Sequence, residues 1–444
     1  MPTRPNILFL MSDEHRYDVS GFAGDRVVRT PVLDSLAAEG VVFDNAYTPS
    51  PICVPARQCM MAGQLPETCG CRVYGDDLEP FSMTFAKRFA QYGYHTVCAG
   101  KLHHMGADQM QGWTKKIGSA GAVAPRYIEG LLAAEMKKYT PEPGTGKWTN
   151  QKEIEHAGVG EGPQQARDRY TMEGALQFIE DYFASPLYDR PQSHRPLLLK
   201  VSLVQPHYPF LTDRDRFNYY LNRVPIYQEE RSDHPKLAKT QAGPPVEATA
   251  RDIRRATAAY YGMIDAIDEY YGHILEALEA VGQDLDDWII IYTSDHGDML
   301  GEHGVWEKRQ FYEGAVRVPL IIRWPRGFAG NRRVGENVSL CDLFATLCDL
   351  CGIEVPEGLD SRSLAPLLRG ESEGWDNVAI SQYGRDELMI KRDDLKYIFF
   401  GADLPEVLFD HSVDAGEGEN LIERPGYGAA VEAFREAVRR IGLE

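Results

Sequence analysis

In this 444-residue sequence, the residue best suited to take part in a chemical reaction is a cysteine at the start of a short helical pattern. Cys53 precedes Pro55 and Arg57 in the spacing Cys-x-Pro-x-Arg. Proline favours the first turn of a helix, and the helix dipole lowers the pKa of a thiol there and attracts anions. The pattern predicts a reactive residue that meets an anionic group, and a buried structural cysteine is the alternative interpretation.

Residues of types that can bind metals follow two apolar runs, at residues 6–11 and 288–293. The residues in question are Asp13, Glu14, Asp295 and His296. Carboxylates and imidazoles at strand ends are typical of metal ligation or acid–base chemistry. If the two runs are strands of one sheet, these side chains and Cys53 can converge on one divalent cation.

Basic residues follow two further apolar runs, at residues 95–99 and 197–204. Lys101 and His103 are two positions apart, so in extended chain they point the same way. His207 has prolines at positions 206 and 209, which restrict the backbone and therefore the direction of the ring. Each residue taken alone is better explained as an ordinary polar side chain.

The elements that must position these groups alternate between strand and helix. The four apolar runs are predicted strands, and predicted helices include residues 32–39, a helix ending at 351 and a long pattern over 246–281, broken once at most. This alternation predicts an α/β fold with a large, mainly parallel or mixed central sheet between helices. Stretches near residues 105–162 and 212–245 are predicted insertions that shape specificity.

The pattern changes after about residue 370. Alternating segments at residues 377–382, 387–390 and 395–400 predict a small antiparallel sheet, closed by a helix over 429–441. We therefore expect a catalytic domain over residues 1–370 and a small C-terminal subdomain over 371–444.

These motifs together resemble the sulfatase family of the alkaline phosphatase-like superfamily. The resemblance covers most of residues 5–370 and includes Cys-x-Pro-x-Arg at 53–57, Gly-Lys-x-His at 100–103 and the segment 301–308. It is nearest the branch that contains choline sulfatase and the phosphonate monoester hydrolases. Departures are Ala62, where many members have threonine, Glu14 in place of a second aspartate, and His296 in place of asparagine.

The resemblance implies a sulfuric ester hydrolase whose Cys53 is oxidised to formylglycine by a formylglycine-generating enzyme. The implied ligands of one divalent metal are Asp13, Glu14, Asp295, His296 and residue 53. The metal is open between Ca²⁺, Mn²⁺ and Mg²⁺, although an imidazole suits Mn²⁺ better than Ca²⁺.

The implied catalytic residues are Cys53, Arg57, Lys101, His103, His207 and Lys308. Arg57 would orient the nucleophile, and Lys101 and Lys308 would neutralise the oxygens of the transferred group. His103 would be the base for the eliminating hydroxyl, and His207, with Lys308, would protonate the departing alcohol. Asp298 and His303 are assigned structural roles.

Two other functions stay open on the sequence. A phosphonate monoester or phosphodiester hydrolase would use the same site, and His296 favours this alternative. A catalytically silent binding protein on the same scaffold would lack site residues, but the main ones are all present.

Composition restricts the partners. A formal net charge of −19 repels nucleic acid and anionic lipid, so neither nucleic acid nor a membrane is an expected partner. The apolar run at residues 7–11 is too short for a signal or membrane segment, which predicts a cytoplasmic protein. A homo-oligomer is compatible with the sequence.

The expected substrate is a small-molecule or saccharide sulfate ester. Aromatic residues in the predicted insertions could stack on a sugar or a cationic head group, although each is more simply explained as core: Trp113, Tyr127, Trp148 and Tyr208. Cys348 and Cys351 lie on an apolar helical stripe and are expected in the core.

Overall fold

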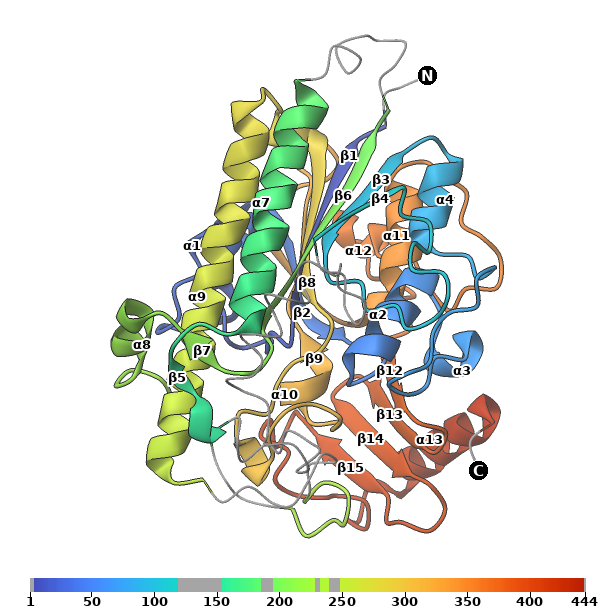
Figure 1. The fold of residues 1–444 in the computed structure, drawn as a ribbon. Helices are drawn as coiled ribbons and strands as arrows, with labels where there is room; N and C mark the ends of the chain where they lie inside the picture. The colour runs from blue at the N-terminus through green and yellow to red at the C-terminus, as the bar shows by residue number, and fades with distance from the viewer. Residues whose placement is uncertain (1–3, 119–153, 185–194, 228–231, 239–247, 443–444) are drawn as a thin grey trace.

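The computed structural model describes residues 4–118, 154–184, 195–227, 232–238 and 248–442. Within these ranges the chain forms one large central sheet with helices on both faces and a smaller antiparallel sheet near the C-terminus (Figure 1). The predicted α/β class and the predicted C-terminal sheet are confirmed.

The central sheet is mixed and has nine strands in the described part of the chain. The order along it is β11, β2, β10, β8, β1, β6, β3 and β4, and the short β9 pairs with β2. The bounds are β1 Asn6–Asp13, β2 Val41–Tyr47, β3 His95–Gly100, β4 Lys115–Ile117, β6 Leu197–Pro206, β8 Trp288–Ser294, β9 Arg317–Val318, β10 Leu320–Arg323 and β11 Arg332–Ser339.

Strand β1 lies at the centre of the sheet, parallel to both β6 and β8. Its alternate residues pack into two separate cores: Phe9 lies in one and Leu10 in the other. A strand buried on both faces needs apolar residues at every position, which explains the unbroken apolar run in its sequence. The four predicted strands are therefore confirmed, and they lie side by side in the order β8, β1, β6 and β3.

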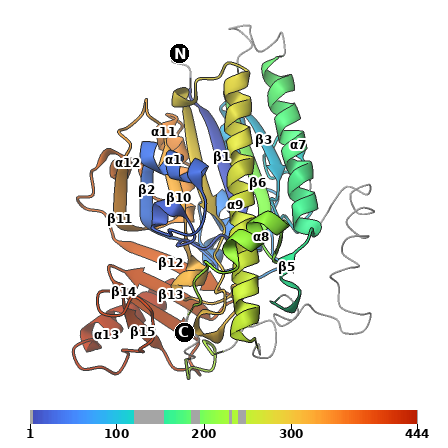
Figure 2. The ribbon, with the colours of Figure 1, turned by 90° about the vertical axis from the view of Figure 1, so that its left-hand side faces the viewer.

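Two layers of helices cover the sheet (Figures 1 and 2). One layer holds α1 (Pro31–Glu39), α7 (Pro163–Phe183) and α9 (Ala250–Ala280). The other holds α2 (Cys53–Ala62), α4 (Phe85–Gln91), α11 (Leu343–Leu350) and α12 (Ala365–Arg369). Helix α9 is continuous over 31 residues, begins at a Thr249–Asp252 capping box and has none of the breaks that its sequence left open.

The remaining elements are short. The structure contains α3 (Pro66–Cys69), α8 (Arg214–Tyr220), α10 (Glu313–Val316), β5 (Gly158–Val159) and β7 (Leu211–Thr212). Single 3-10 turns lie at Gly21–Ala23, Leu285–Asp287, Glu302–Gly304 and Leu340–Asp342.

The C-terminal sheet pairs β12 (Val378–Tyr383), β13 (Glu387–Arg392), β14 (Leu395–Phe400) and β15 (Val407–Asp410) in that order, all antiparallel. Helix α13 (Gly428–Ile441) covers one face, and the other face packs on residues of the body formed by the central sheet and its helices, such as Phe311 and Tyr312.

A buried ion network joins the C-terminal sheet to α10 and the residues just before it. The Nζ of Lys396, on β14, lies 2.6 Å from a carboxylate oxygen of Glu313 and 2.5 Å from one of Glu417, and it donates to the carbonyl of Phe311 at 2.9 Å. Because a buried charge is costly unless it is paired, this network holds the C-terminal sheet at a defined position on the larger body.

The two predicted insertions contain elements of the fold. Residues 115–117 form the edge strand β4 of the central sheet, and residues 214–220 form α8, which packs on α9. Tyr127 and Trp148 lie outside the described residues. Trp113 is core, packed edge-to-face on Phe85, which confirms the simpler of its two interpretations and excludes a ligand-stacking role.

The expected core position of Cys348 and Cys351 is confirmed, because both lie in the core under α11. No helix in the described part of the chain is both long enough and apolar enough to span a membrane.

A lysine in the middle of β6 leads to a prediction about stability. Lys200 is fully buried, its Nζ has no hydrogen-bond partner among the described residues, and the ammonium lies 5.1 Å from the ring centroid of Phe9. Burial lowers the pKa of Lys200 to about 7. Because the unfolded chain keeps the ordinary value of about 10.4, it binds more protons than the folded chain between pH 7 and about 10, and stability rises with pH across that window.

Lys200→Met is therefore expected to stabilise the protein by about 2–4 kcal/mol at pH 6.5, with a smaller gain at pH 9.5. Urea unfolding at the two pH values measures the gain. Lys115→Met, on the exposed edge strand β4, is the control and should show no such trend. An equal effect of Lys200→Met at both pH values would contradict the argument.

Candidate active site

The carboxyl ends of β1, β3, β6 and β8 meet at one edge of the sheet, because these strands are parallel neighbours. A cavity of about 310 Å³ opens there. It is lined by Ile52, Cys53, Tyr74, Lys101, His103, Gln164, Arg167, Val204, His207, Tyr208, Lys308 and Arg309. Five of the predicted catalytic residues thus share one cavity, and Arg57 does not line it.

Cys53 is the first residue of α2, and its side chain is almost fully buried at the cavity wall. Ile52 caps the helix without a side-chain hydrogen bond, so the helix N-terminus stays available to an anion. Burial raises the pKa of the Cys53 thiol, but Lys101 and the ring of His296 outweigh this, and the pKa lies below its usual value.

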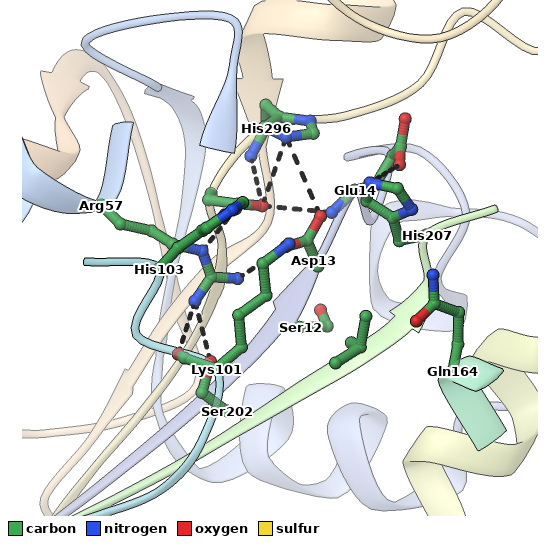
Figure 3. A network of polar contacts seen from close by, with 12 residues as sticks. Ser12, Asp13, Glu14, Arg57, Lys101, His103, Gln164, Ser202, His207 and His296 are labelled. Carbon is green, nitrogen blue, oxygen red and sulfur yellow. Dashed lines mark hydrogen bonds and ion pairs between the residues drawn. The ribbon is translucent and has the colours of Figure 1, made fainter. Parts of the chain in front are cut away.

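Arg57, one turn further along α2, holds two carboxylates beneath the cavity. Its Nε donates to Asp295 at 2.6 Å, and a terminal nitrogen donates to Asp13 at 3.0 Å. The other terminal nitrogen donates to the carbonyl of Lys101 and the hydroxyl of Ser202, each at 2.9 Å. With no surface exposed, this guanidinium orients the carboxylates, so its geometry supports a positioning role (Figure 3).

Lys101 and His103 project from the segment after β3 toward the same cavity. The Nζ of Lys101 forms an ion pair with Asp13. Burial opposes ionisation of Asp13, but Lys101 and Arg57 outweigh it and hold the pKa of Asp13 well below its usual range. The ring of His103 lies edge-on to Tyr74, with its Nε2 3.4 Å from the phenol oxygen, and burial lowers its pKa to about 3.

His207, Lys308 and Glu14 form a second polar cluster, of which Figure 3 shows His207 and Glu14. The Nζ of Lys308 lies 3.0 Å from Nε2 of His207 and donates to Glu14 at 2.8 Å. Nδ1 of His207 faces the carbonyl of Tyr208 at 2.8 Å and must donate to it, which leaves Nε2 as the acceptor from Lys308. Burial and Lys308 lower the pKa of His207 well below its usual value, so the imidazole is neutral.

Three buried acceptors between β1 and β8 receive no hydrogen bond from any residue that the structure describes. They are Asp13 Oδ1, Glu14 Oε1 and His296 Nε2. Nε2 of His296 lies 3.9 Å from Asp13 Oδ1 and 3.8 Å from Asp295 Oδ1. Lone pairs that face one another without a donor repel, and a bound cation removes that repulsion, so Asp13, Asp295 and His296 fit a divalent metal.

Glu14 lies at the edge of this metal-binding group. A ligand atom of Glu14 lies close to ligand atoms of Asp13 and His207, and its Oε2 accepts a hydrogen bond from Lys308. Burial raises the pKa of Glu14 well above its usual range, against the opposing charge of Lys308. Its predicted role as a ligand therefore depends on Oε1 alone.

The backbone around the cavity is strained. Non-glycine residues with positive φ are Glu14 at 70°, His103 at 65°, Glu307 at 65° and Arg309 at 68°. Such conformations cost about 1–3 kcal/mol each and persist where the surroundings over-determine them, which is common at functional sites.

The cavity also contains residues that sequence reasoning missed: Tyr74, Gln164, Arg167 and Arg309. No motif includes the first three, and only the position of Arg309 beside Lys308 gave a signal. Asp298 and His303 do not line the cavity: Asp298 accepts from the backbone of Leu300, and His303 stacks on Tyr312.

Comparison with known protein families matches two family models. The model described as sulfatase covers residues 5–353, and the model described as N-sulphoglucosamine sulphohydrolase, C-terminal, covers residues 301–442. The second match begins at residue 301, in the last part of the body formed by the central sheet, and includes the whole C-terminal sheet.

Individual relatives match over almost the full chain. A choline-sulfatase of Rhizobium meliloti is 31% identical over 98% of this chain and 86% of its own length. An arylsulfatase of Clostridium perfringens is 27% identical over 98% of this chain and 93% of its own length.

Solved structures share the fold. A phosphonate monoester hydrolase of Agrobacterium radiobacter superimposes with a TM-score of 0.79 at 24% identity, covering 99% of this chain and 95% of its own. A protein in complex with its substrate D-glucosamine-2-N,6-O-disulfate gives a TM-score of 0.77 at 22% identity, with coverage of 99% and 98%.

Proposed function

The chain belongs to the sulfatase family and is a sulfuric ester hydrolase, and on that premise we propose that it acts through a formylglycine at position 53 and one divalent metal ion. We propose a small organic or carbohydrate sulfate ester as the substrate. The observation that carries the proposal is the position of Cys53 in one cavity with Lys101, His103, His207 and Lys308.

The formylglycine and the metal ion would each supply defined chemistry. A formylglycine hydrate carries two hydroxyls on one carbon, so that one can attack sulfur and the other can expel sulfate. A divalent cation held by Asp13, Asp295 and His296 would lower the pKa of an oxygen bound to it. The unpartnered acceptors of Asp13 and His296 support this assignment, and an imidazole ligand favours Mn²⁺ over Ca²⁺.

The residues of the cavity would bind and protonate the ester. Lys101 and Lys308 lie at the wall that holds Cys53 and would neutralise the sulfuryl oxygens. His103, held by Tyr74, is neutral and can accept a proton from the second hydroxyl. Lys308 donates toward Nε2 of His207, so the two together would deliver a proton to the departing alcohol.

His207→Ala is expected to lower kcat/KM about 100-fold to 1,000-fold for an alkyl sulfate and less than about fivefold for 4-nitrophenyl sulfate. Nitrophenolate is a weak base and can leave without being protonated, whereas an alkoxide is a strong base and must receive a proton as it leaves. Initial rates on both esters measure the difference, and His273→Ala, exposed on α9, is the control. Equal losses on both esters would remove His207 from protonation.

A second function would use the same machinery. Hydrolysis of phosphonate monoesters or phosphodiesters is supported by His296 and by the shared fold of the phosphonate monoester hydrolases. The kcat/KM values for 4-nitrophenyl sulfate and 4-nitrophenyl phenylphosphonate, measured on one preparation, discriminate the two functions. A higher value for the sulfate supports the proposal, and a higher value for the phosphonate supports the alternative.

Maturation is part of the proposal. Conversion of Cys53 by a formylglycine-generating enzyme would lower the intact mass by about 18 Da. Mass spectrometry of protein produced with and without that enzyme should show this change together with the gain of activity. Activity without the mass change would contradict the proposed nucleophile. The cytoplasmic location stays a prediction.

A further inference from the structure

Two arginines of the cavity stand apart from its other cations. Arg167 lies near the start of α7, and Arg309 follows Lys308 in the loop before α10. The Nε of each is buried without an acceptor. Within the part of the chain that the structure describes, neither guanidinium forms an ion pair, and the one hydrogen bond found for the two guanidiniums runs from Arg167 to Oε1 of Gln164 at 3.1 Å.

The lysines of the same cavity are compensated. Lys101 is paired with Asp13, and Lys308 with Glu14 at 2.8 Å. No acidic residue lines the cavity among the described residues. Asp168, next to Arg167 in sequence, uses its carboxylate to accept from the backbone of Val204 and Gln205 and from the side chain of Gln205. Within the described ranges, nothing in the cavity therefore compensates the positive charge of the two arginines.

Such an arrangement is costly without a ligand. A buried donor without an acceptor costs about 1–3 kcal/mol, and more when the group is charged. Burial lowers the pKa of Arg167 despite the nearby Asp168, as expected for a cation without a close partner. A chain of net charge −19 has many carboxylates for pairing, yet none of the described ones reaches these guanidiniums.

Both arginines come from segments that the surroundings hold in place. Gln164 holds Arg167 through Oε1, and its Nε2 donates to the carbonyl of Tyr208 at 2.7 Å. The backbone of Arg309, at a φ of 68°, donates to the carbonyl of Pro51 at 2.8 Å, next to the start of α2. The guanidinium fork matches planar, oxygen-rich anions, because it presents several donors in a fixed geometry.

We propose that Arg167 and Arg309 bind a second anionic group on the substrate, so that the enzyme takes sulfate esters whose alcohol portion carries a carboxylate or a further sulfate. This inference rests on the proposed function, in which Lys101 and Lys308 bind the sulfate that reacts. Both anions present oxygens to guanidinium donors, and the experiment below distinguishes them.

The same geometry disfavours a cationic alcohol such as choline. A quaternary ammonium needs carboxylates or open aromatic faces. The described lining has no carboxylate, and both of its tyrosine rings already have a neighbour. The ring of Tyr74 meets that of His103, with centroids 5.5 Å apart, and the ring of Tyr208 has the ammonium of Lys308 at 4.8 Å from its centroid. Choline sulfate is therefore expected to be a poor substrate, although a choline-sulfatase is 31% identical to this chain.

Matched esters test the proposal. The 3- and 4-isomers of sulfooxybenzoate carry a carboxylate, the corresponding sulfooxybenzamides are neutral and similar in shape, and benzene-1,3- and 1,4-disulfate carry a second sulfate. For at least one isomer, wild-type kcat/KM is expected to be about 10-fold to 100-fold higher for an anionic ester than for the amide, since charge-assisted hydrogen bonds have that strength. Whether the carboxylate ester or the disulfate has the higher kcat/KM identifies the second anionic group of the substrate.

Arg167→Gln and Arg309→Gln should each reduce kcat/KM for the preferred anionic ester about 10-fold or more, with less than about threefold change for the benzamide. Arg167→Lys and Arg309→Lys keep the charge and should recover part of the loss. Arg169→Gln is the matched control, because Arg169 lies two residues further along α7, is exposed and pairs with Glu161.

Equal wild-type rates on every matched anionic and neutral ester would overturn the inference. Parallel losses on both esters in the glutamine variants would also overturn it, by assigning the arginines to the reacting sulfate. In both cases the wild type still hydrolyses sulfate esters. Failure of the proposed function is a different result, in which the mature wild type hydrolyses none of them.

Discussion

Replacement of Cys53 by serine is expected to stop the enzyme after one sulfuryl transfer. A serine hydroxyl at the start of α2 can attack sulfur, because Lys101 and Lys308 still bind the sulfuryl oxygens. The resulting sulfate ester lacks the second hydroxyl on the same carbon, so it cannot eliminate sulfate. We expect kcat to fall at least about 10⁴-fold, the usual effect of removing a nucleophile.

Intact mass measurement after incubation with substrate should show an increase of about 80 Da on the serine variant, in a stoichiometry near one. Cys53→Ala is the matched control, because it keeps the helix start and has no nucleophile, so it should show no adduct. Continued turnover by Cys53→Ser at more than about 1% of the wild-type rate would be incompatible with elimination from residue 53.

Removal of the metal is the second large effect that we expect. Asp13, Asp295 and His296 direct lone pairs at one another, and Arg57 fixes both carboxylates. Chelation should therefore lower kcat at least about 10³-fold, because several kcal/mol of charge stabilisation disappear. Added metal at about 100 times its Kd should restore activity and stabilise the fold by about 2.7 kcal/mol.

The metal preference supplies a variant with an expected direction. His296→Asn replaces nitrogen with an oxygen ligand and should shift the ratio of Ca²⁺ to Mn²⁺ affinity toward Ca²⁺ by about tenfold or more. Calorimetric titration of the protein with each metal measures this independently of activity. No dependence of the melting temperature on Mn²⁺ or Ca²⁺ would contradict the site.

A second acidic group in the chain supplies the control for the metal experiment. Glu313, His411 and Glu417 also place ligand atoms close together, but Lys396 already pairs with both glutamates. A lysine ammonium occupies the position that a cation would take, so His411→Ala should leave the metal affinity unchanged.

The sequence predicted the main strands because each is a continuous apolar run, and a strand buried on both faces must be apolar throughout. It left a break in 246–281 open, whereas α9 is continuous, because local propensity does not report how far packing against the sheet extends a helix. It also treated Trp113 as part of an insertion, whereas its ring packs on Phe85 in the core.

Motif residues at strand ends were predictable for a related reason. The ends of parallel neighbouring strands meet at one edge, so Asp13, Lys101, His207 and Asp295 had to lie close together once their strands were recognised. The resemblance to the sulfatases supplied their roles, and the cavity places Cys53 beside Lys101 and His207.

By itself, the sequence determined the order of the strands along the chain, the residue at the start of α2 and the set of ionisable groups near it, since these follow from local pattern and motif. Only the tertiary structure decided that Arg57 pairs with two carboxylates, while no carboxylate of the described residues pairs with Arg167 or Arg309. The physical reason is that pairing between charges depends on distances across packed elements, here α2 against β1 and β8 and α7 against β6. The periodicity of residues within one helix or strand does not predict such distances between elements.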